Sequence, residues 1–132
     1  MTYGNTVTLD TAFDESLAAV RDALAAEGFG IVSEVDIAAT LKAKLGVEIE
    51  PQIILGACRP DFAHKALAVE PSIGLLLPCN VVVRSSGDTT IVEMIDPSML
   101  VEVTGNADLA AIADEVATHI SAAMQALGGP GS

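Results

Sequence analysis

Apolar and polar residues recur with two different periods, and these periods divide the chain into predicted strands and helices. Thr6 to Leu9 alternates polar and apolar residues, which predicts a short first strand. From Phe13 to Leu24 the apolar residues fall on one helical face. Thr11 with Asp14 gives a capping-box pattern at the start of this helix, and Gly28 is placed to end it.

The same alternation of strand and helix continues in the next part of the chain. Residues 29–35 predict a second strand, and Asp36 is placed to cap a second helix that stops at Gly46. Residues 52–57 predict a third strand. The apolar residues expected to face inward from the second helix are Ile37, Leu41 and Leu45.

A third helix and a hairpin follow. Pro60 suits the first turn of a helix because its missing N–H would have no partner there, and the helix is expected to run to about Val69, with Phe62 and Ala66 toward the core. Residues 73–84 and 89–95 predict a hairpin. The pattern then predicts a last helix capped by Asn106 and ending near Leu127.

These elements predict an α+β fold with the order βαβαβαββα and a mixed β-sheet covered by helices. The chain shows no internal repeat and no linker, so residues 1–132 are expected to form a single domain. Its ordered core is predicted over residues 5–127, and residues 128–132 are predicted to be a flexible tail.

The charge and composition exclude several classes of partner. The net charge is −12, and the chain has no Trp, one Tyr and three Phe. Such a surface repels phosphate backbones and lacks stacking platforms, so we expect no nucleic acid and no membrane as partners. The most apolar run, residues 73–83, is too short to span a bilayer. Without a signal-peptide pattern, the expected location is the cytoplasm, where Cys58 and Cys79 would be free thiols.

Two short motifs show a family resemblance. These motifs are Gly56-Ala57-Cys58-Arg59-Pro60 and residues 75–81, Leu-Leu-Leu-Pro-Cys-Asn-Val, and matching positions extend from about Gly28 to Pro97. The pattern resembles the bacterial and archaeal family called domain of unknown function 302. The resemblance implies a compact α+β domain with a curved mixed sheet, commonly a homodimer, and no established activity. Arg59 stands where the family pattern more often has Asn.

The candidate chemistry gathers between Cys58 and Lys65, where a strand is predicted to lead into a helix. Two of the six basic residues and one of the two histidines lie in this stretch. A helix N-terminus carries partial positive charge, which favours anions and lowers the pKa of a nearby thiol. The candidate ligand-binding residues are Cys58, Arg59, His64, Lys65, Cys79 and Asn80.

Four functions follow from this stretch. The first is a homodimeric binding or sensing module for a small anionic or thiol-reactive ligand. The second is a thiol-dependent redox enzyme that uses Cys58, with His64 as a base and Cys79 as a resolving thiol. The third is a zinc or copper(I) site formed by the same three side chains. The fourth is a purely structural interaction domain in which both cysteines pack as small hydrophobes. The sequence identifies no cofactor and does not decide whether the chain is an enzyme.

Overall fold

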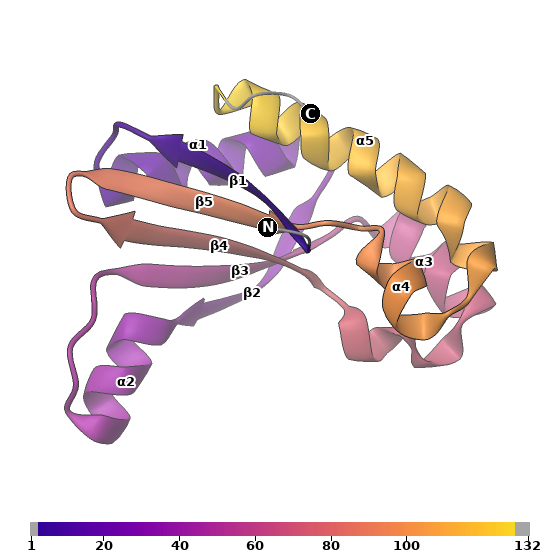
Figure 1. The fold of residues 1–132 in the computed structure, drawn as a ribbon, viewed down its shortest axis with the longest axis horizontal. Helices are drawn as coiled ribbons and strands as arrows, with labels where there is room; N and C mark the ends of the chain where they lie inside the picture. The colour runs from indigo at the N-terminus through magenta and orange to yellow at the C-terminus, as the bar shows by residue number, and fades with distance from the viewer. Residues whose placement is uncertain (1–2, 129–132) are drawn as a thin grey trace.

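One antiparallel sheet forms the centre of the molecule. The computed structural model describes residues 3–128, and within them five strands pair in the order β1-β5-β4-β3-β2 (Figure 1). Every neighbouring pair is antiparallel. The strands are β1 (Gly4–Leu9), β2 (Gly30–Asp36), β3 (Gln52–Cys58), β4 (Cys79–Ser86) and β5 (Thr89–Ile95).

Five α-helices and two 3₁₀-helices accompany the sheet in the described part of the chain. Among residues 3–128, no helix combines the length and the apolarity that a bilayer crossing requires. The α-helices are α1 (Phe13–Ala26), α2 (Ile37–Leu45), α3 (Pro60–Val69), α4 (Met99–Thr104) and α5 (Ala110–Ala126), and the 3₁₀-helices are η1 (Pro71–Leu76) and η2 (Ala107–Leu109).

The α+β class is confirmed, and the predicted order βαβαβαββα is observed with one additional helix, α4, before the last. The sheet is antiparallel instead of mixed. A parallel neighbour requires a long crossover that is usually a helix packed on the sheet. Helix α2, which connects β2 to β3, has only nine residues and buries none of them, so it does not form such a crossover. Strand β3 therefore runs beside β2 in the opposite direction. Strands β1 and β2 do point the same way, but they lie at opposite edges and never pair.

The core lies between one face of the sheet and helices α1 and α5. The alternation of strands β4 and β5 directs Val81, Val83, Val92 and Met94 into this layer, where each is buried. Helix α1 packs against α5 above them (Figure 1). The other face carries polar and half-buried residues, as antiparallel sheets with one covered face commonly do.

Helix α2 projects from the molecule at the end opposite α3 and α4 (Figure 1). Its predicted cap and stop are confirmed: Asp36 accepts a hydrogen bond from the Ala39 N–H at 2.9 Å, and Gly46 adopts the left-handed conformation with φ 69°. Its predicted inward face is wrong for Leu45, which is 70% exposed, and Ile37 and Leu41 are only half-buried. An amphipathic period identifies an apolar face, but it does not identify what covers that face.

Four further details differ from the prediction. Thr11 is not the N-cap of α1, because Ala12 occupies that position. Residues 73–76 belong to η1 instead of a strand, so β4 begins only at Cys79, after a cis peptide bond between Leu77 and Pro78. Helix α4 was not predicted. Asn106 caps η2, the short turn before α5, by accepting a hydrogen bond from the Asp108 N–H at 3.0 Å.

The middle of β3 requires a residue without a side chain. Gly56 pairs with Ser33 of β2 on one side and with Asn80 of β4 on the other. A β-carbon at this position would meet the Ser33 hydroxyl and would lie 2.6 Å from Cγ of Pro78, well inside van der Waals contact. The serine hydroxyl has a rotatable bond, but the proline ring cannot move aside. Gly56 therefore lets Pro78 pack across the sheet next to Cys79.

We predict that Gly56→Ala lowers the free energy of unfolding by about 1–3 kcal/mol, because the added methyl group overpacks against Pro78. Urea denaturation followed by circular dichroism measures the change. Gly30→Ala is the matched control, since it is also a strand glycine and its β-carbon would have only an ordinary contact, 3.8 Å from the Cys58 carbonyl oxygen. Equal losses in the two variants would contradict the steric account.

Candidate functional site

The predicted strand-to-helix junction is present. Strand β3 ends at Cys58, Arg59 occupies the N-cap position, and Pro60 is the first residue of α3, as its missing N–H favours. Residue Ala57 pairs with Cys79 across β3 and β4. Cys58 therefore lies one residue beyond this pair, and the two cysteines are neighbours although 21 positions separate them in the sequence.

Both cysteines line one small cavity beneath α3. Its volume is about 30 Å³, which is room for one or two water molecules and not for a larger ligand. The walls are mainly hydrocarbon, and both thiols are free and only partly buried. The other side chains that close the cavity include Phe29, Phe62, Leu77, Leu100 and Val116.

Burial controls the protonation of Cys79. Loss of hydration, and to a smaller extent repulsion by the nearby Cys58 thiolate, together raise the pKa of its thiol from 9.0 to about 11. Cys79 is therefore a neutral thiol at physiological pH. In that state it is a weak hydrogen-bond donor and neither a nucleophile nor a metal ligand.

Arg59 does not direct its charge at the thiols. Its guanidinium lies over the ring of Phe62, 4.5 Å from the centroid, and Nη1 donates to the Glu27 backbone oxygen at 3.1 Å. Its Nε pairs with Asp61 at 3.2 Å. Desolvation is the largest single influence on the pKa of the Asp61 carboxyl and raises it, but the hydrogen bond and charge of Arg59, together with backbone hydrogen bonds, outweigh it and lower the pKa. Arg59 thus joins the end of α1 to the start of α3, and its cation is already paired.

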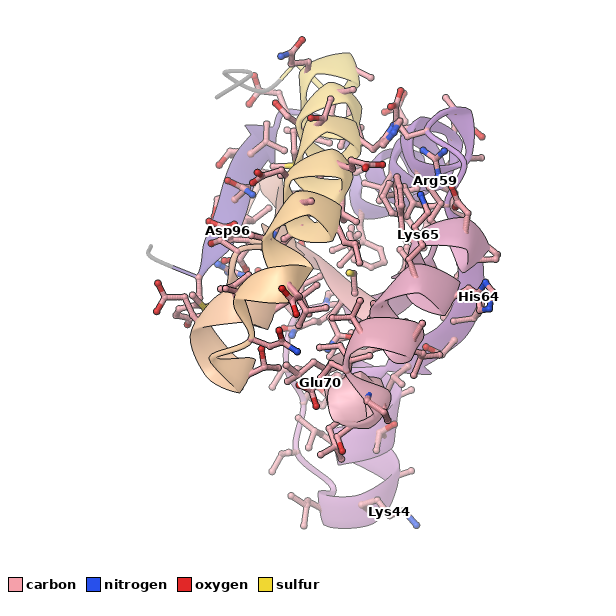
Figure 2. All side chains as sticks on the ribbon, turned by 90° about the vertical axis from the view of Figure 1, so that its right-hand side faces the viewer. Lys44, Arg59, His64, Lys65, Glu70 and Asp96 are labelled. Carbon is pink, nitrogen blue, oxygen red and sulfur yellow. The ribbon has the colours of Figure 1, made fainter. Side chains whose placement is uncertain are left out.

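A second pair of contacts strengthens this connection. His119 of α5 lies against Phe62 with ring centroids 5.7 Å apart, and its Nδ1 is 2.8 Å from Oε1 of Glu27. Lys65 is exposed, and its ammonium is 5.7 Å from the Phe62 centroid. Figure 2 shows Arg59 and Lys65 on the same side of α3. Three distant parts of the chain therefore meet around one aromatic ring.

The remaining candidates do not reach the cavity. His64 is exposed on α3 and points outward (Figure 2), so it lies away from both cysteines. Asn80 is exposed on the uncovered face of the sheet, opposite Gly56. Within residues 3–128, no group of three or more His, Cys, Asp or Glu side chains is arranged to hold a metal ion. Cys58, His64 and Cys79 therefore form no shared coordination site here.

Sequence reasoning missed the partners of the basic residues. Glu27 and His119 lie 32 and 60 positions from Arg59 along the chain, and nothing in their local pattern indicated that contact. One signal was available: Phe62 follows Arg59 by three residues in a chain that has only three Phe. An arginine beside a scarce aromatic residue favours cation–π stacking.

We predict that Cys79 makes stability fall at alkaline pH. The unfolded thiol ionises above pH 9, whereas the folded thiol keeps its proton up to about pH 11, so the free energy of unfolding falls between these values by on the order of 2 kcal/mol. Urea denaturation at several pH values measures this slope. The Cys79→Ala variant should lose this fall in stability with pH. The Cys58→Ala variant should keep most of it, because burial is the larger cause of the raised Cys79 pKa. An identical slope in wild type and Cys79→Ala would contradict the prediction.

Comparison with known proteins supports the resemblance seen in the sequence. The family model described as "Domain of unknown function DUF302" matches residues 5–127. The crystal structure of an uncharacterized conserved DUF302 protein from Bacillus stearothermophilus has 28% sequence identity and a TM-score of 0.88, and the match covers 96% of this chain and 99% of that one. No significant match occurs among curated proteins. Since the family model spans nearly the whole sequence, the chain belongs to the DUF302 family.

Proposed function

We propose that the protein is a homodimeric binding module, and that its ligand is a small uncharged, thiol-reactive molecule that contacts Cys58 and Cys79. The observation that carries this proposal is that both free thiols line the same cavity. The proposal takes the cytoplasm as the location, because thiols stay reduced there.

The charges around the junction favour an uncharged ligand over an anion. Arg59 already pairs with Asp61 and binds the Glu27 carbonyl, so little of its charge is left for an incoming anion. The chain as a whole has a net charge of −12, which repels anions at long range. A neutral electrophile needs no free cation at Arg59 and is not repelled by the net charge.

The two thiols have different roles in this module. Cys58 ends β3 directly before the first turn of α3, at the positive end of the helix dipole, and we assign it the reactive role. Cys79 keeps its proton because its pKa is about 11, so it forms a wall of the site and hydrogen-bonds weakly to the ligand. A redox enzyme would need His64 near Cys58 as a base, and His64 points outward (Figure 2).

We predict that iodoacetamide at neutral pH alkylates Cys58 about tenfold or more faster than Cys79, since only the thiolate reacts. Peptide mass spectrometry follows both sites, and the urea-unfolded chain gives the reference rates. Iodoacetate is the matched anionic reagent. Relative to the unfolded chain, its reaction with Cys58 should be slowed more than that of iodoacetamide. A folded Cys58 that resists both reagents, or that prefers iodoacetate, would refute the proposed ligand class.

The projecting arm supports the homodimer. We define the α2 arm as residues 30–50, which comprise β2, α2 and the segment leading to β3. It holds five of the ten exposed large apolar side chains of the described residues, and β2 is an edge strand with one side unpaired. A nine-residue helix without buried contacts is marginal in water. The exposed apolar residues of the arm are Val32, Val35, Leu45, Val47 and Ile49.

A second copy of the chain is the partner that the charges favour. Helix α2 contains Lys42 and Lys44 and no acidic residue; Lys42 pairs with Glu48 at 3.2 Å, and Lys44 lies near the tip of the arm (Figure 2). The whole chain carries −12, so the body of a second copy presents the opposite charge to this helix. A twofold arrangement in which each arm lies on the body of the other copy would cover the apolar residues of both arms.

We predict that the wild-type protein sediments with the mass of two 13.5 kDa chains, and that Leu45→Glu combined with Ile49→Glu makes it a monomer that is still folded. Neither residue is in the core, so the loss is specific to association. Analytical ultracentrifugation measures the mass. Leu75→Glu is the matched control, because Leu75 is 88% exposed at the other end of the molecule. A monomeric wild type across micromolar concentrations would contradict the homodimer.

A further inference from the structure

A second and larger cavity lies on the other side of Cys79. We call it the α4 chamber. It lies between η1, α4 and the adjoining ends of β1, β4 and β5, and its volume is about 260 Å³. That is the volume of roughly nine water molecules and is just below the usual range of small-molecule pockets. The residues that line it are Tyr3, Leu76, Cys79, Ile95, Asp96, Pro97, Met99, Leu100 and Val103.

The α4 chamber has an apolar floor and an open mouth. Pro97 and Leu100 are buried and form its base together with the partly buried Cys79. Tyr3 and Val103 stand at the mouth, and Val103 is 64% exposed. Cys79 and Leu100 also line the small cavity beneath α3, so they separate the two spaces. A ligand held here would rest against the face of Cys79 that Cys58 does not share.

The polar groups at the chamber exclude anions. Among the described residues, no Lys, Arg or His lines it, and the one charged residue that does is Asp96. The Asp96 carboxylate accepts a hydrogen bond from the Ser98 N–H at 2.9 Å, which holds it at the turn into α4. Figure 2 shows Asp96 on the opposite side of α5 from Arg59 and Lys65, far from the cations of the junction. A carboxylate or phosphate entering the chamber would meet this fixed negative charge without compensation.

We propose that the α4 chamber binds a small, uncharged, largely hydrocarbon molecule, held by Leu76, Met99 and Leu100, and that Asp96 selects against anions of the same shape. This inference deepens the proposed function, because Cys79 lines both sites and the chamber offers an uncharged molecule about 260 Å³ on the far side of that thiol from the 30 Å³ cavity. Binding in the chamber itself requires no reactive thiol.

Two fluorescent probes test the chemical class. N-phenyl-1-naphthylamine is uncharged, and 8-anilino-1-naphthalenesulfonate has the same rings with an added sulfonate. We expect the neutral probe to bind with a blue-shifted, enhanced emission and the anionic probe to bind about tenfold or more weakly. Asp96→Asn keeps the acceptor for the Ser98 N–H and removes the charge. It should therefore reduce the difference in affinity between the two probes. Equal affinities of the wild-type protein for the two probes would overturn the proposal.

Two matched substitutions locate the binding. Val103→Asp places a charge at the mouth and should weaken the neutral probe about tenfold. Leu75→Asp places the same charge on a nearby residue that is more exposed but does not line the chamber, and it should leave the affinity unchanged. Equal losses in both variants would place the probe on the outer surface. A dimeric wild type that Val103→Asp converts to a monomer would make this end a subunit interface. Either result overturns the proposal.

The two proposals can fail separately. Cys58→Ser should abolish rapid alkylation and leave the affinity for N-phenyl-1-naphthylamine unchanged. If the alkylation experiment fails and the probe still binds as described, the chamber stands without the thiol chemistry. If Cys58 reacts selectively and no probe binds, the chamber proposal is wrong and the thiol site remains.

Discussion

The arrangement around Phe62 is the interaction on which the site depends. Arg59 stacks on the ring and binds the carbonyl at the end of α1, while His119 of α5 packs against the same ring and bonds to Glu27. These contacts fix α3 above the two cysteines and close the cavity beneath it. They also pair the positive charge of Arg59, which is next to Cys58 in the sequence, with other protein groups. The same guanidinium therefore stabilises the junction and leaves it unsuited to anions.

Local patterns predicted the elements well and their partners poorly. The periods gave β3 from Gln52 and β5 from Thr89 to Ile95, because alternation is a property of adjacent residues. The antiparallel order, the exposed α2 and the partners of Arg59 depend on residues far apart, and a period carries no information about those. For the site, the sequence pattern identified Cys58 and Cys79 as candidates, but their proximity depends on the pairing of β3 with β4. The outward direction of His64 likewise depends on how α3 packs, which its local pattern does not contain.

Cys79 connects the features that one would otherwise treat separately. It begins β4 directly after Pro78, and Pro78 can pack there only because Gly56 has no side chain. From that position its sulfur lines a small cavity on one side and a larger apolar one on the other. The raised pKa of its thiol reflects this hydrocarbon environment. The glycine, the proline and the protonated thiol thus form one local unit at the end of the sheet.

The independence of α2 from the core has an evolutionary consequence. Since the helix buries no residue, substitutions along it change the folding free energy little. Selection can then alter which surface the arm recognises while the sheet and its cavities are preserved. Relatives of such a protein would then differ in how their chains associate before they differ in fold. Sequence variation between them would be concentrated in helix α2.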